Sequence, residues 1–499
     1  MFMKSGLVIS AFVCLMLLFI WSCRTEHFTN DPSDLPTFSE DTLSFDTVFT
    51  TIGSASRYFK IYNTHADFLK ITQISLAGGS GSHFHINVDG LPGIAFRNLI
   101  LRPGDSLYVF CEVLINPADP LTVSPYIIQD SIEVETNGVT RRILLEARGQ
   151  NANYYPSKSN KGNISVIDLG QNKLVWSDPK PYIIYGIVVI DHGTLEIAEG
   201  TQVHFFGGVT KAKDDQGNTF FYNDGRLVIG SDARLKIMGS TAKPVICQGV
   251  RLESSYAQVP GQWSGIFLDR QSKGNMIHHA VIRNNLIGIY ADSLSNCEID
   301  HVIFAYNSYS GVAAYAANVK MSNCLFYEQG QSSFTAQCGG QYLMEYCTIA
   351  NFGNDESGAF VSNNFCSDPP FCTQITRSAL DAHFVNCVIT GNNKDEFFIR
   401  KDPDGSVPFN MSLDHCLIKV SDLLKPDLFP DFMKLYTNQC TNRSNLDSLF
   451  KNISTNDFHP DTLSVLEKKA IPINSISDDL EGNSRDLVEP DLGCYEYIH

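Results

Sequence analysis

A six-residue pattern of apolar and polar positions recurs in the second half of the chain. Its first, fourth and sixth positions are apolar, and the positions between them vary. The copies begin at Ile277, Ile299, Met321, Met344, Phe384 and Leu413. Their fourth positions are separated by 22, 22, 23, 40 and 29 residues. A period near 22 residues, built from short apolar runs without helical spacing, predicts a solenoid of stacked parallel strands.

The third position of the pattern predicts a turn. Positions four and six alternate as in a strand with one buried face, but position one lies three residues before position four, so the chain must bend between them. Asn and His tolerate turn dihedrals and can hydrogen-bond along a stack. We expect a structural turn ladder rather than a proton-transfer or metal cluster at the third positions, His279, His301, Asn323, Tyr346, Asn386 and His415. The fourth-position thiols should point into the core as small apolar groups, at Cys324, Cys347, Cys387 and Cys416.

Three polar insertions interrupt the repeat and should emerge from the stack as loops. Residues 210–224 predict a protruding hairpin, residues 362–372 a turn-rich loop, and residues 401–406 a short Asp-Gly loop. Cys366 and Cys372 flank Asp-Pro-Pro in the second of these and are the best disulfide candidates in an oxidising compartment.

With this repeat, residues 165–499 resemble the right-handed parallel β-helix of the pectate-lyase-like superfold, and more narrowly the β-helix lipoproteins of Bacteroidota. The most specific part is the ending, Asp479-Leu-Glu-Gly-Asn-Ser-Arg485 followed by Pro490-Asp-Leu-Gly-Cys-Tyr-Glu496. The resemblance implies a β-helix over 165–421 and closing coils with a cap over 422–499. An open solenoid end needs a cap, in which Arg485 would pair with Asp479 or Asp491.

Residues 41–150 show a different pattern of about seven short alternating strands separated by Pro-Gly-Asp and Thr-Asn-Gly turns. This density predicts a β-sandwich. The segment is similar to immunoglobulin-like domains of the ASH/DUF1573 type, which implies a spacer or a partner-binding role. Residues 151–164 form the expected linker. The predicted fold class is therefore all-β, a right-handed parallel β-helix preceded by an immunoglobulin-like β-sandwich.

The N-terminus predicts targeting. Residues 1–22 carry Lys4 and then an apolar stretch too short to span a bilayer comfortably, which is typical of a signal peptide. The ending Ile20-Trp-Ser-Cys23 resembles a lipobox, which implies lipidation at Cys23, an outer-membrane lipoprotein and membrane contact through the lipid anchor only. The polar residues 23–40 would be a tether.

The formal net charge of −17 disfavours nucleic acid as a partner. It also disfavours a polyanionic glycan, unless a cation or a local basic groove intervenes.

Candidate chemistry is sparse. Asp300 and Glu345 fall two rungs apart, about 9–10 Å by strand spacing, which suits a carboxylate pair, and Arg283 is an available base. Asp402 and Asp404 could hold Ca²⁺. Outward carboxylates on a sheet are usually solubilising, Asp-Gly loops are usually turns, and no C-x₂-C metal pair occurs.

The sequence therefore favours a lipoprotein whose β-helix binds a glycan or an envelope protein without catalysis and without a cofactor. The alternative is a polysaccharide lyase or a glycoside hydrolase acting in a β-helix groove.

Overall fold

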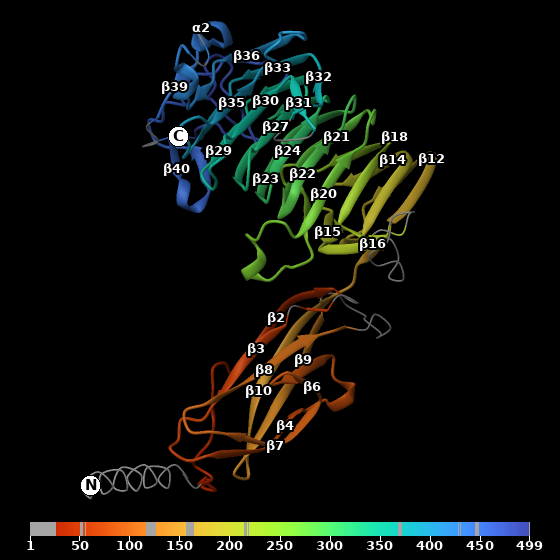
Figure 1. The fold of residues 1–499 in the computed structure, drawn as a ribbon, viewed down its shortest axis with the longest axis vertical. Coiled ribbons are helices and arrows are strands. Elements are labelled where there is room, and N and C mark those ends of the chain that lie inside the picture. The colour runs from red at the N-terminus through yellow and green to blue at the C-terminus, as the bar shows by residue number, and fades with distance from the viewer. Residues whose placement is uncertain are drawn as a thin grey trace, which may run out of the picture. The chain divides into compact units, whose positions relative to one another are not determined.

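The computed structural model describes residues 26–49, 53, 54, 56–115, 126–155, 164–213, 217, 219–367, 372–427, 429, 431–444 and 449–498. The chain divides into two compact units, residues 1–151 and residues 152–499 (Figure 1). None of the described helices is long and apolar enough to cross a membrane. Cys23 and the predicted signal peptide lie outside the described residues.

The first unit is a sandwich of two five-stranded sheets. One sheet has the order β1 (Thr37–Phe38), β3 (Arg57–Tyr62), β8 (Ser106–Val113), β5 (Phe84–Val88) and β6 (Leu91–Gly93). The other has the order β2 (Thr42–Phe49), β10 (Val139–Gln150), β9 (Tyr126–Thr136), β4 (Leu69–Leu76) and β7 (Ala95–Leu101). Alternate residues of both sheets point inward, and Phe59, Ile71 and Val109 are fully buried between them.

The described part of the predicted tether packs on this sandwich. Phe28 forms a parallel bridge with Phe68, and their rings lie 5.5 Å apart. Phe38, in β1, pairs with Ile61. The described part of the predicted tether is therefore attached to the domain at Phe28 and Phe38, because these two aromatic side chains gain burial against it.

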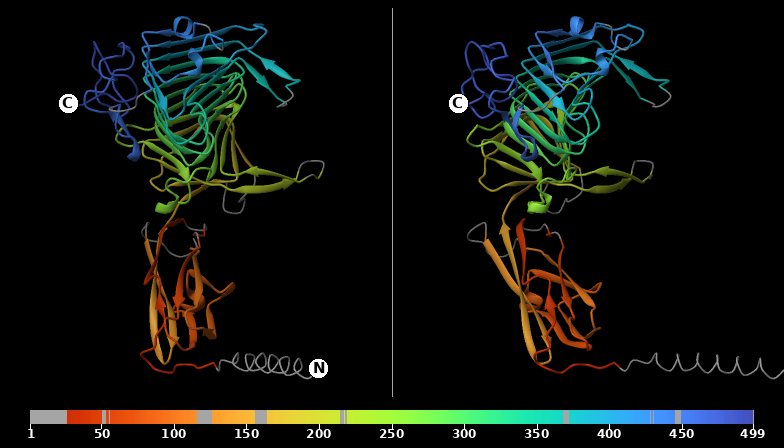
Figure 2. Two further views of the ribbon diagram at one scale, coloured as in Figure 1. Left: turned by 60° about the vertical axis from the view of Figure 1, so that its left-hand side comes forward. Right: turned by 90° about the vertical axis from the view of Figure 1, so that its left-hand side faces the viewer.

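The second unit is a parallel β-helix whose 25 strands belong to one continuous sheet (Figures 1 and 2). Its first strands are β11 (Asn153–Tyr155), β12 (Ile164–Trp176), β13 (Tyr182–Tyr185), β14 (Ile187–Ala198), β15 (Gln202–Phe206), β18 (Arg226–Met238), β19 (Val245–Gly249), β20 (Trp263–Leu268), β21 (Asn275–Arg283), β22 (Asn285–Ala291), β23 (Asn296–Asn307) and β24 (Ser310–Tyr315). The remaining strands are β25 (Asn318–Ser322), β26 (Leu325–Gln329), β27 (Phe334–Gln337), β28 (Gly340–Glu345), β29 (Thr348–Asn351), β30 (Ala359–Ser362), β33 (Leu380–Val385), β34 (Val388–Gly391), β35 (Phe397–Arg400), β36 (Phe409–Asp414), β37 (Leu417–Ile418), β38 (Thr437–Asn438) and β39 (Thr441–Asn442).

The start of the β-helix differs from the predicted linker. Strand β11 lies inside residues 151–164 and pairs in parallel with β13. Tyr155 packs on Trp176 with ring centroids 4.9 Å apart, and Trp176 stacks on Tyr182. Aromatic burial therefore draws this part of the expected linker into the first coil.

The six-residue pattern sets the corner of each coil. All six third positions have left-handed backbone, with φ between 47° and 58°. The corner separates the apolar first position from the inward fourth and sixth positions, so equivalent residues of neighbouring coils stack. Phe304 and Phe326, both at position six, have ring centroids 4.8 Å apart with near-parallel planes.

The fourth positions form the expected inward ladder of thiols. Cys324, Cys347, Cys387 and Cys416 are each at most 1% exposed and are not in disulfides. Burial raises the pKa of the Cys347 and Cys416 thiols. The ladder continues to Cys440 through a seventh corner at Gln439 (φ 51°). Its neighbours Thr437 and Asn442 are polar, so the apolar pattern does not reveal this copy.

The C-terminal segment, residues 449–498, lies along the side of the stack (Figure 2). It contains strands β40 (Phe450–Asn452) and β41 (Asp457–Pro460) and otherwise mainly turns, and its Phe458 and Leu466 are buried against the coils. The core at the C-terminal end is continued by η4 (Asp422–Leu424) and α2 (Phe432–Tyr436), through the buried Leu423 and Phe432. The segment thus covers a flank rather than closing the end as expected.

The predicted insertions are loops and hairpins. Strands β16 (Val209–Lys213) and β17 (Thr219–Asn223) pair antiparallel as the protruding hairpin. Strands β31 (Asn364–Cys366) and β32 (Ile375–Arg377) form a second hairpin, in which a disulfide joins Cys366 to Cys372. Short 3₁₀ turns occur at η1 (Gly79–Gly81), η3 (Ser254–Tyr256) and η5 (Ile453–Thr455).

Candidate functional site

One face of the β-helix carries three parallel ladders of outward side chains. They lie on β18, β21, β23, β25, β28, β33 and β36, where each strand pairs in register with the next. The middle ladder, immediately before position one of the repeat, is Lys236, Met276, Glu298, Lys320, Leu343, His383 and Ser412. A second ladder lies two residues before the middle ladder on each strand, and we call it the amide ladder because most of its side chains are amides. Its members are Asn296, Asn318, Gln341, Asp381 and Asn410.

A hollow of about 440 Å³ opens on this face, and we call it the cationic hollow. Its charged lining residues are Arg234, Lys236, Lys320 and Glu298, so three cations face one anion. Among the described residues, Arg234 and Lys236 have no ion-pair partner, whereas Lys320 lies 3.4 Å from Glu345. An adjoining hollow of about 310 Å³ shares Arg234 and adds Lys273 and Asp232. The face therefore holds a local excess of positive charge in a protein of net charge −17.

The amide ladder borders the cationic hollow and is fixed by its own hydrogen bonds. Asn318 Nδ2 donates to Gln341 Oε1 (3.1 Å), and the Gly274 N–H donates to Asn296 Oδ1 (2.6 Å). Each side-chain amide keeps further donor and acceptor capacity directed outward. Such groups can hydrogen-bond to sugar hydroxyls laid across the rungs.

The two predicted carboxylates lie on a neighbouring ladder, at position two of the repeat. Asp300 pairs in register with Ser322, which pairs with Glu345, so they are two rungs apart. Asp300 accepts from Ser322 Oγ at 2.6 Å, and Glu345 lies 3.4 Å from Lys320 Nζ. The predicted base Arg283 is elsewhere, with Nε donating to Gln248 Oε1 at 2.8 Å. The structure does not bring these three residues together.

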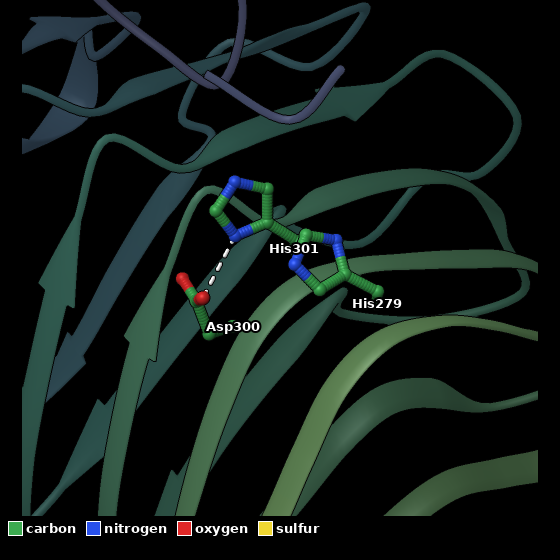
Figure 3. Close-up of side chains that lie close together, drawn as sticks. All are labelled: His279, Asp300 and His301. Atoms are coloured by element: carbon green, nitrogen blue, oxygen red, sulfur yellow. Dashed lines mark hydrogen bonds and ion pairs between the residues drawn. The ribbon is translucent and has the colours of Figure 1, made fainter. Parts of the chain in front are cut away.

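His279, Asp300 and His301 form a compact cluster at the corners of two adjacent coils (Figure 3). The imidazole rings of His279 and His301 are 4.3 Å apart, and His301 Nδ1 lies 2.7 Å from Asp300 Oδ2. One ligand atom from each residue lies within 4.8 Å of the other two. No hydrogen bond to the His279 ring occurs within the described part of the chain.

The protonation of the cluster follows from these contacts. Burial and the charge of His301 lower the pKa of His279. Burial would lower the pKa of His301 as well, but the hydrogen bond and charge of Asp300 raise it. Burial alone would raise the pKa of Asp300, which the contacts with His301 and Ser322 hold below its usual value. His279 is therefore neutral at neutral pH.

The third-position ladder also docks the C-terminal segment. Tyr346 Oη donates to the Ile471 carbonyl (2.8 Å), as does Asn386 Nδ2 (2.8 Å), and Asn386 Oδ1 accepts from the Ile471 N–H (3.0 Å). At position five, Leu325 and Val388 are directed away from the core but are buried beneath this segment. Position five is therefore unavailable as a working surface where the segment covers it.

The predicted cap contacts differ in their partners. Arg485 forms its ion pair with Glu496 (3.2 Å) and not with Asp479 or Asp491, and its guanidinium lies 3.8 Å from the Tyr346 ring centroid. Asp479 instead accepts from the N–H groups of Glu481, Asn483 and Glu496, and Asp491 from those of Lys468 and Tyr497. These carboxylates satisfy turn backbone that is buried with them, which leaves the guanidinium to Glu496.

Asp402 and Asp404, the candidate calcium ligands, share an arginine. Arg377 Nε donates to Asp402 Oδ1 (2.8 Å), and its terminal nitrogen donates to Asp404 Oδ2 (2.9 Å). The hydrogen bonds from Arg377 and Ser406 lower the pKa of Asp402 to about 2. The two carboxylates thus have a cationic partner within the protein.

A hydrogen-bonded chain joins Ser412, His383 and Asp381 on the same face as the cationic hollow. His383 Nδ1 lies 2.7 Å from Ser412 Oγ, and Nε2 lies 3.1 Å from Asp381 Oδ1. The order matches that of a nucleophile, base and acid. Because the His383 and Asp381 side chains are 43% and 49% exposed, water screens the chain, and we assign it no chemistry.

Comparison with known proteins agrees on the fold. Residues 264–410 match the family model "right handed beta helix region". No curated protein matches the chain. With the parallel sheet and the sandwich, this match confirms the predicted fold class.

Three solved structures show distant likeness. The catalytic unit of a thermostable GH87 α-1,3-glucanase from Streptomyces thermodiastaticus is 11% identical, with a TM-score of 0.23 and 72% of each chain covered. A family 123 glycoside hydrolase from Clostridium perfringens is 10% identical, with a TM-score of 0.19, covering 38% of this chain and 43% of its own. The ASH/PapD-like domain 7 of human CEP192 is 15% identical, with a TM-score of 0.17, covering 26% of this chain and 96% of its own.

Three charged residues of the cationic hollow, Arg234, Lys236 and Glu298, were not among the predicted site residues. Arg234 and Lys236 form an Arg-x-Lys string on β18, and Lys236 aligns with Glu298 and Lys320 only once the register is known. Ile237 is the equivalent of Ile277, a full 40 residues earlier. The middle ladder could have been predicted by extending the repeat backward from Ile277 to Ile237. It also requires the position before the first apolar residue to be counted as part of the repeat.

Proposed function

We propose that the β-helix binds a glycan bearing carboxylate or sulfate groups along the face that contains the cationic hollow. The observation that carries the proposal is the pair Arg234 and Lys236, which line the hollow without ion-pair partners among the described residues. Unpaired cations on an acidic protein create a local field that attracts anionic groups. Guanidinium and ammonium groups form charge-assisted hydrogen bonds with carboxylate and sulfate.

The amide ladder supports the same function. Asn296, Asn318 and Gln341 follow one another along neighbouring rungs, about 4.8 Å apart. A linear glycan laid along the stack meets a repeated set of amide groups beside the cations. This arrangement favours binding by many weak polar contacts spread over a long surface.

The surroundings of Asp300 and Glu345 are more consistent with a binding function than with a catalytic one. A glycosidase needs one carboxyl to donate a proton and a second to act as base or nucleophile. Here Asp300 is held by Ser322 and His301, and Glu345 lies beside Lys320. These contacts favour the ionised form of Asp300 and disfavour its use as an acid.

A second surface favours a protein partner in the cell envelope. Tyr58, Tyr108 and Phe110 project from β3 and β8 of the sandwich and are 52%, 37% and 39% exposed. Their ring centroids are 5.5 to 5.9 Å apart, so they form one aromatic patch. An apolar patch of this kind is typical of an interaction site. We also propose that Cys23 carries a lipid that anchors the chain to the outer membrane, where this patch would meet an envelope protein.

Affinity electrophoresis of the full chain tests the proposal. The protein should be retarded in gels that contain an acidic glycan such as polygalacturonate, alginate or a sulfated galactan, and the retardation should fall as salt rises. Gels that contain neutral glucan or mannan provide the control. Equal retardation by neutral and acidic glycans, or none by any of them, would refute the proposal.

A further inference from the structure

The corner ladder brings two imidazoles and a carboxylate together on adjacent coils. His279 is the left-handed corner within β21, and His301 is the equivalent corner within β23, where Asp300 precedes it and pairs in register with His278. The left-handed corners at His279 (φ 48°) and His301 (φ 54°) turn both rings to the same side of the stack. The triangle of donors in Figure 3 is therefore a consequence of the repeat, not of a flexible loop.

We propose that His279, Asp300 and His301 bind a divalent transition-metal ion of the zinc type. Imidazole nitrogen and carboxylate oxygen are common zinc ligands, at 2.0–2.2 Å from the metal. A tetrahedral ion with such bonds needs donors about 3.4 Å apart. The donors already lie within 4.8 Å of one another, and His301 and Asp300 are 2.7 Å apart, so small side-chain rotations close the site.

Neighbouring groups hold the ligands in place. Asp300 Oδ1 accepts from Ser322 Oγ at 2.6 Å, which leaves Oδ2 on the side of the imidazoles. His301 Nε2 lies 3.8 Å from Asp478 Oδ1 and 3.4 Å from Asn323 Nδ2. Arg485 donates to Asn323 Oδ1, so the Asn323 amide directs Nδ2 at His301 Nε2 and fixes that side of the imidazole, which leaves Nδ1 beside Asp300 Oδ2.

His279 is the residue that a purely structural ladder does not explain. At the same corner, Asn323 and Asn386 hydrogen-bond to the C-terminal segment. His279 makes no such bond in the described part of the chain, although its ring is half-buried beside His301. Three protein ligands leave one coordination position of a tetrahedral ion for water. The site lies outside the cationic hollow and does not depend on glycan binding.

The chain contains its own control at Asp414 and His415. These residues occupy the same two positions of the repeat, with His415 Nδ1 lying 2.8 Å from Asp414 Oδ1. Their neighbours on the third-position ladder are Asn386 and Gln439, so no second imidazole is present. Asp414 and His415 reproduce two of the three proposed ligands and lack the third.

Calorimetric titration of chelator-treated full-length protein with ZnCl₂ tests the proposal. We expect saturable binding of one Zn²⁺ per chain and a higher melting temperature with Zn²⁺. His279→Asn should weaken binding by about tenfold or more, and the fold should persist because Asn occupies this corner at Asn323 and Asn386. Asp300→Asn should weaken binding similarly, whereas His415→Asn should leave it unchanged.

Three results would overturn the assignment. The first is no saturable Zn²⁺ binding by the wild-type protein. The second is binding by His279→Asn as tight as that of the wild type, with the melting temperature confirming that the variant is folded. The third is loss of binding in His192→Asn instead, which would place the ion at the other clustered donors, Asp168, Asp191 and His192.

Discussion

Arg485 donates a hydrogen bond to Asn323 Oδ1 at 2.8 Å, across 162 residues of sequence. Asn323 is a corner of the β-helix, and Arg485 belongs to the C-terminal segment that covers the flank. Asn323 also donates to the Asp478 carbonyl (3.1 Å), so one amide binds the segment in both directions. The corner residues therefore serve two purposes: they turn the chain, and they hold the segment that shields the coils.

Replacement of Arg485 by Met should release the C-terminal segment. The Arg485 side chain is 2% exposed, and its loss leaves Glu496 buried without its cation. Breaking a buried ion pair costs about 3–5 kcal/mol. Hydrogen exchange should show faster exchange of the Gly493 and Cys494 amides, which donate to Asn386 O and Thr348 Oγ1. Lys469→Met, at an exposed cation of the same segment, should leave both amides protected. Unchanged protection in Arg485→Met would contradict this role.

Replacement of Asn386 by Ala should weaken the clamp on Ile471. The substitution removes the partner of the Ile471 N–H and one of the two donors to its carbonyl, which keeps its hydrogen bond from Tyr346 Oη. Unpaired buried polar groups cost about 1–3 kcal/mol each, and Ala at a left-handed corner adds about 1–2 kcal/mol. His415→Ala carries the same backbone cost without a contact to Ile471, so the difference between the two variants isolates the clamp. In urea unfolding, we expect Asn386→Ala to be the less stable by about 2 kcal/mol. Equal losses would show that only the corner geometry matters.

The contact between Arg377 and Asp402 should make the folding stability depend on pH in the acidic range. The folded-state pKa of Asp402 is about 2, below the value near 3.9 in an unfolded chain. The contribution is therefore present above about pH 4 and is lost as the pH falls toward 2. Asp402→Asn should show a smaller drop in melting temperature between pH 5 and pH 2.5 than the wild type does. Asp404→Asn, whose side chain is 66% exposed, should follow the wild type. Parallel curves for the wild type and Asp402→Asn would argue against the assignment.

The β-helix was predictable because the buried positions recur in the sequence as a regular pattern of apolar residues. The apolar first, fourth and sixth positions and the Asn or His corner specify each coil locally. The flank cover was not predictable in this way. Its contacts, such as that of Arg485 with Asn323, join residues that do not belong to one repeat. A turn-rich sequence also does not indicate whether the segment covers the end of the β-helix or its flank. The cationic hollow was not predicted because Lys236 and Lys320 share one ladder only through the strand register, and the first step of that register spans 40 residues of sequence.

The central claim is most directly tested by titrating an acidic oligosaccharide into the wild-type protein and into the double variant Arg234→Gln/Lys236→Gln. Removing two charge-assisted contacts, each about 1.5–3 kcal/mol, should weaken binding by at least tenfold. Lys425→Gln, at a cation paired with Asp422 near the C-terminal end of the stack, provides the control and should bind like the wild type. Binding by the double variant as tight as that of the wild type, with both proteins folded, would contradict glycan binding at this face.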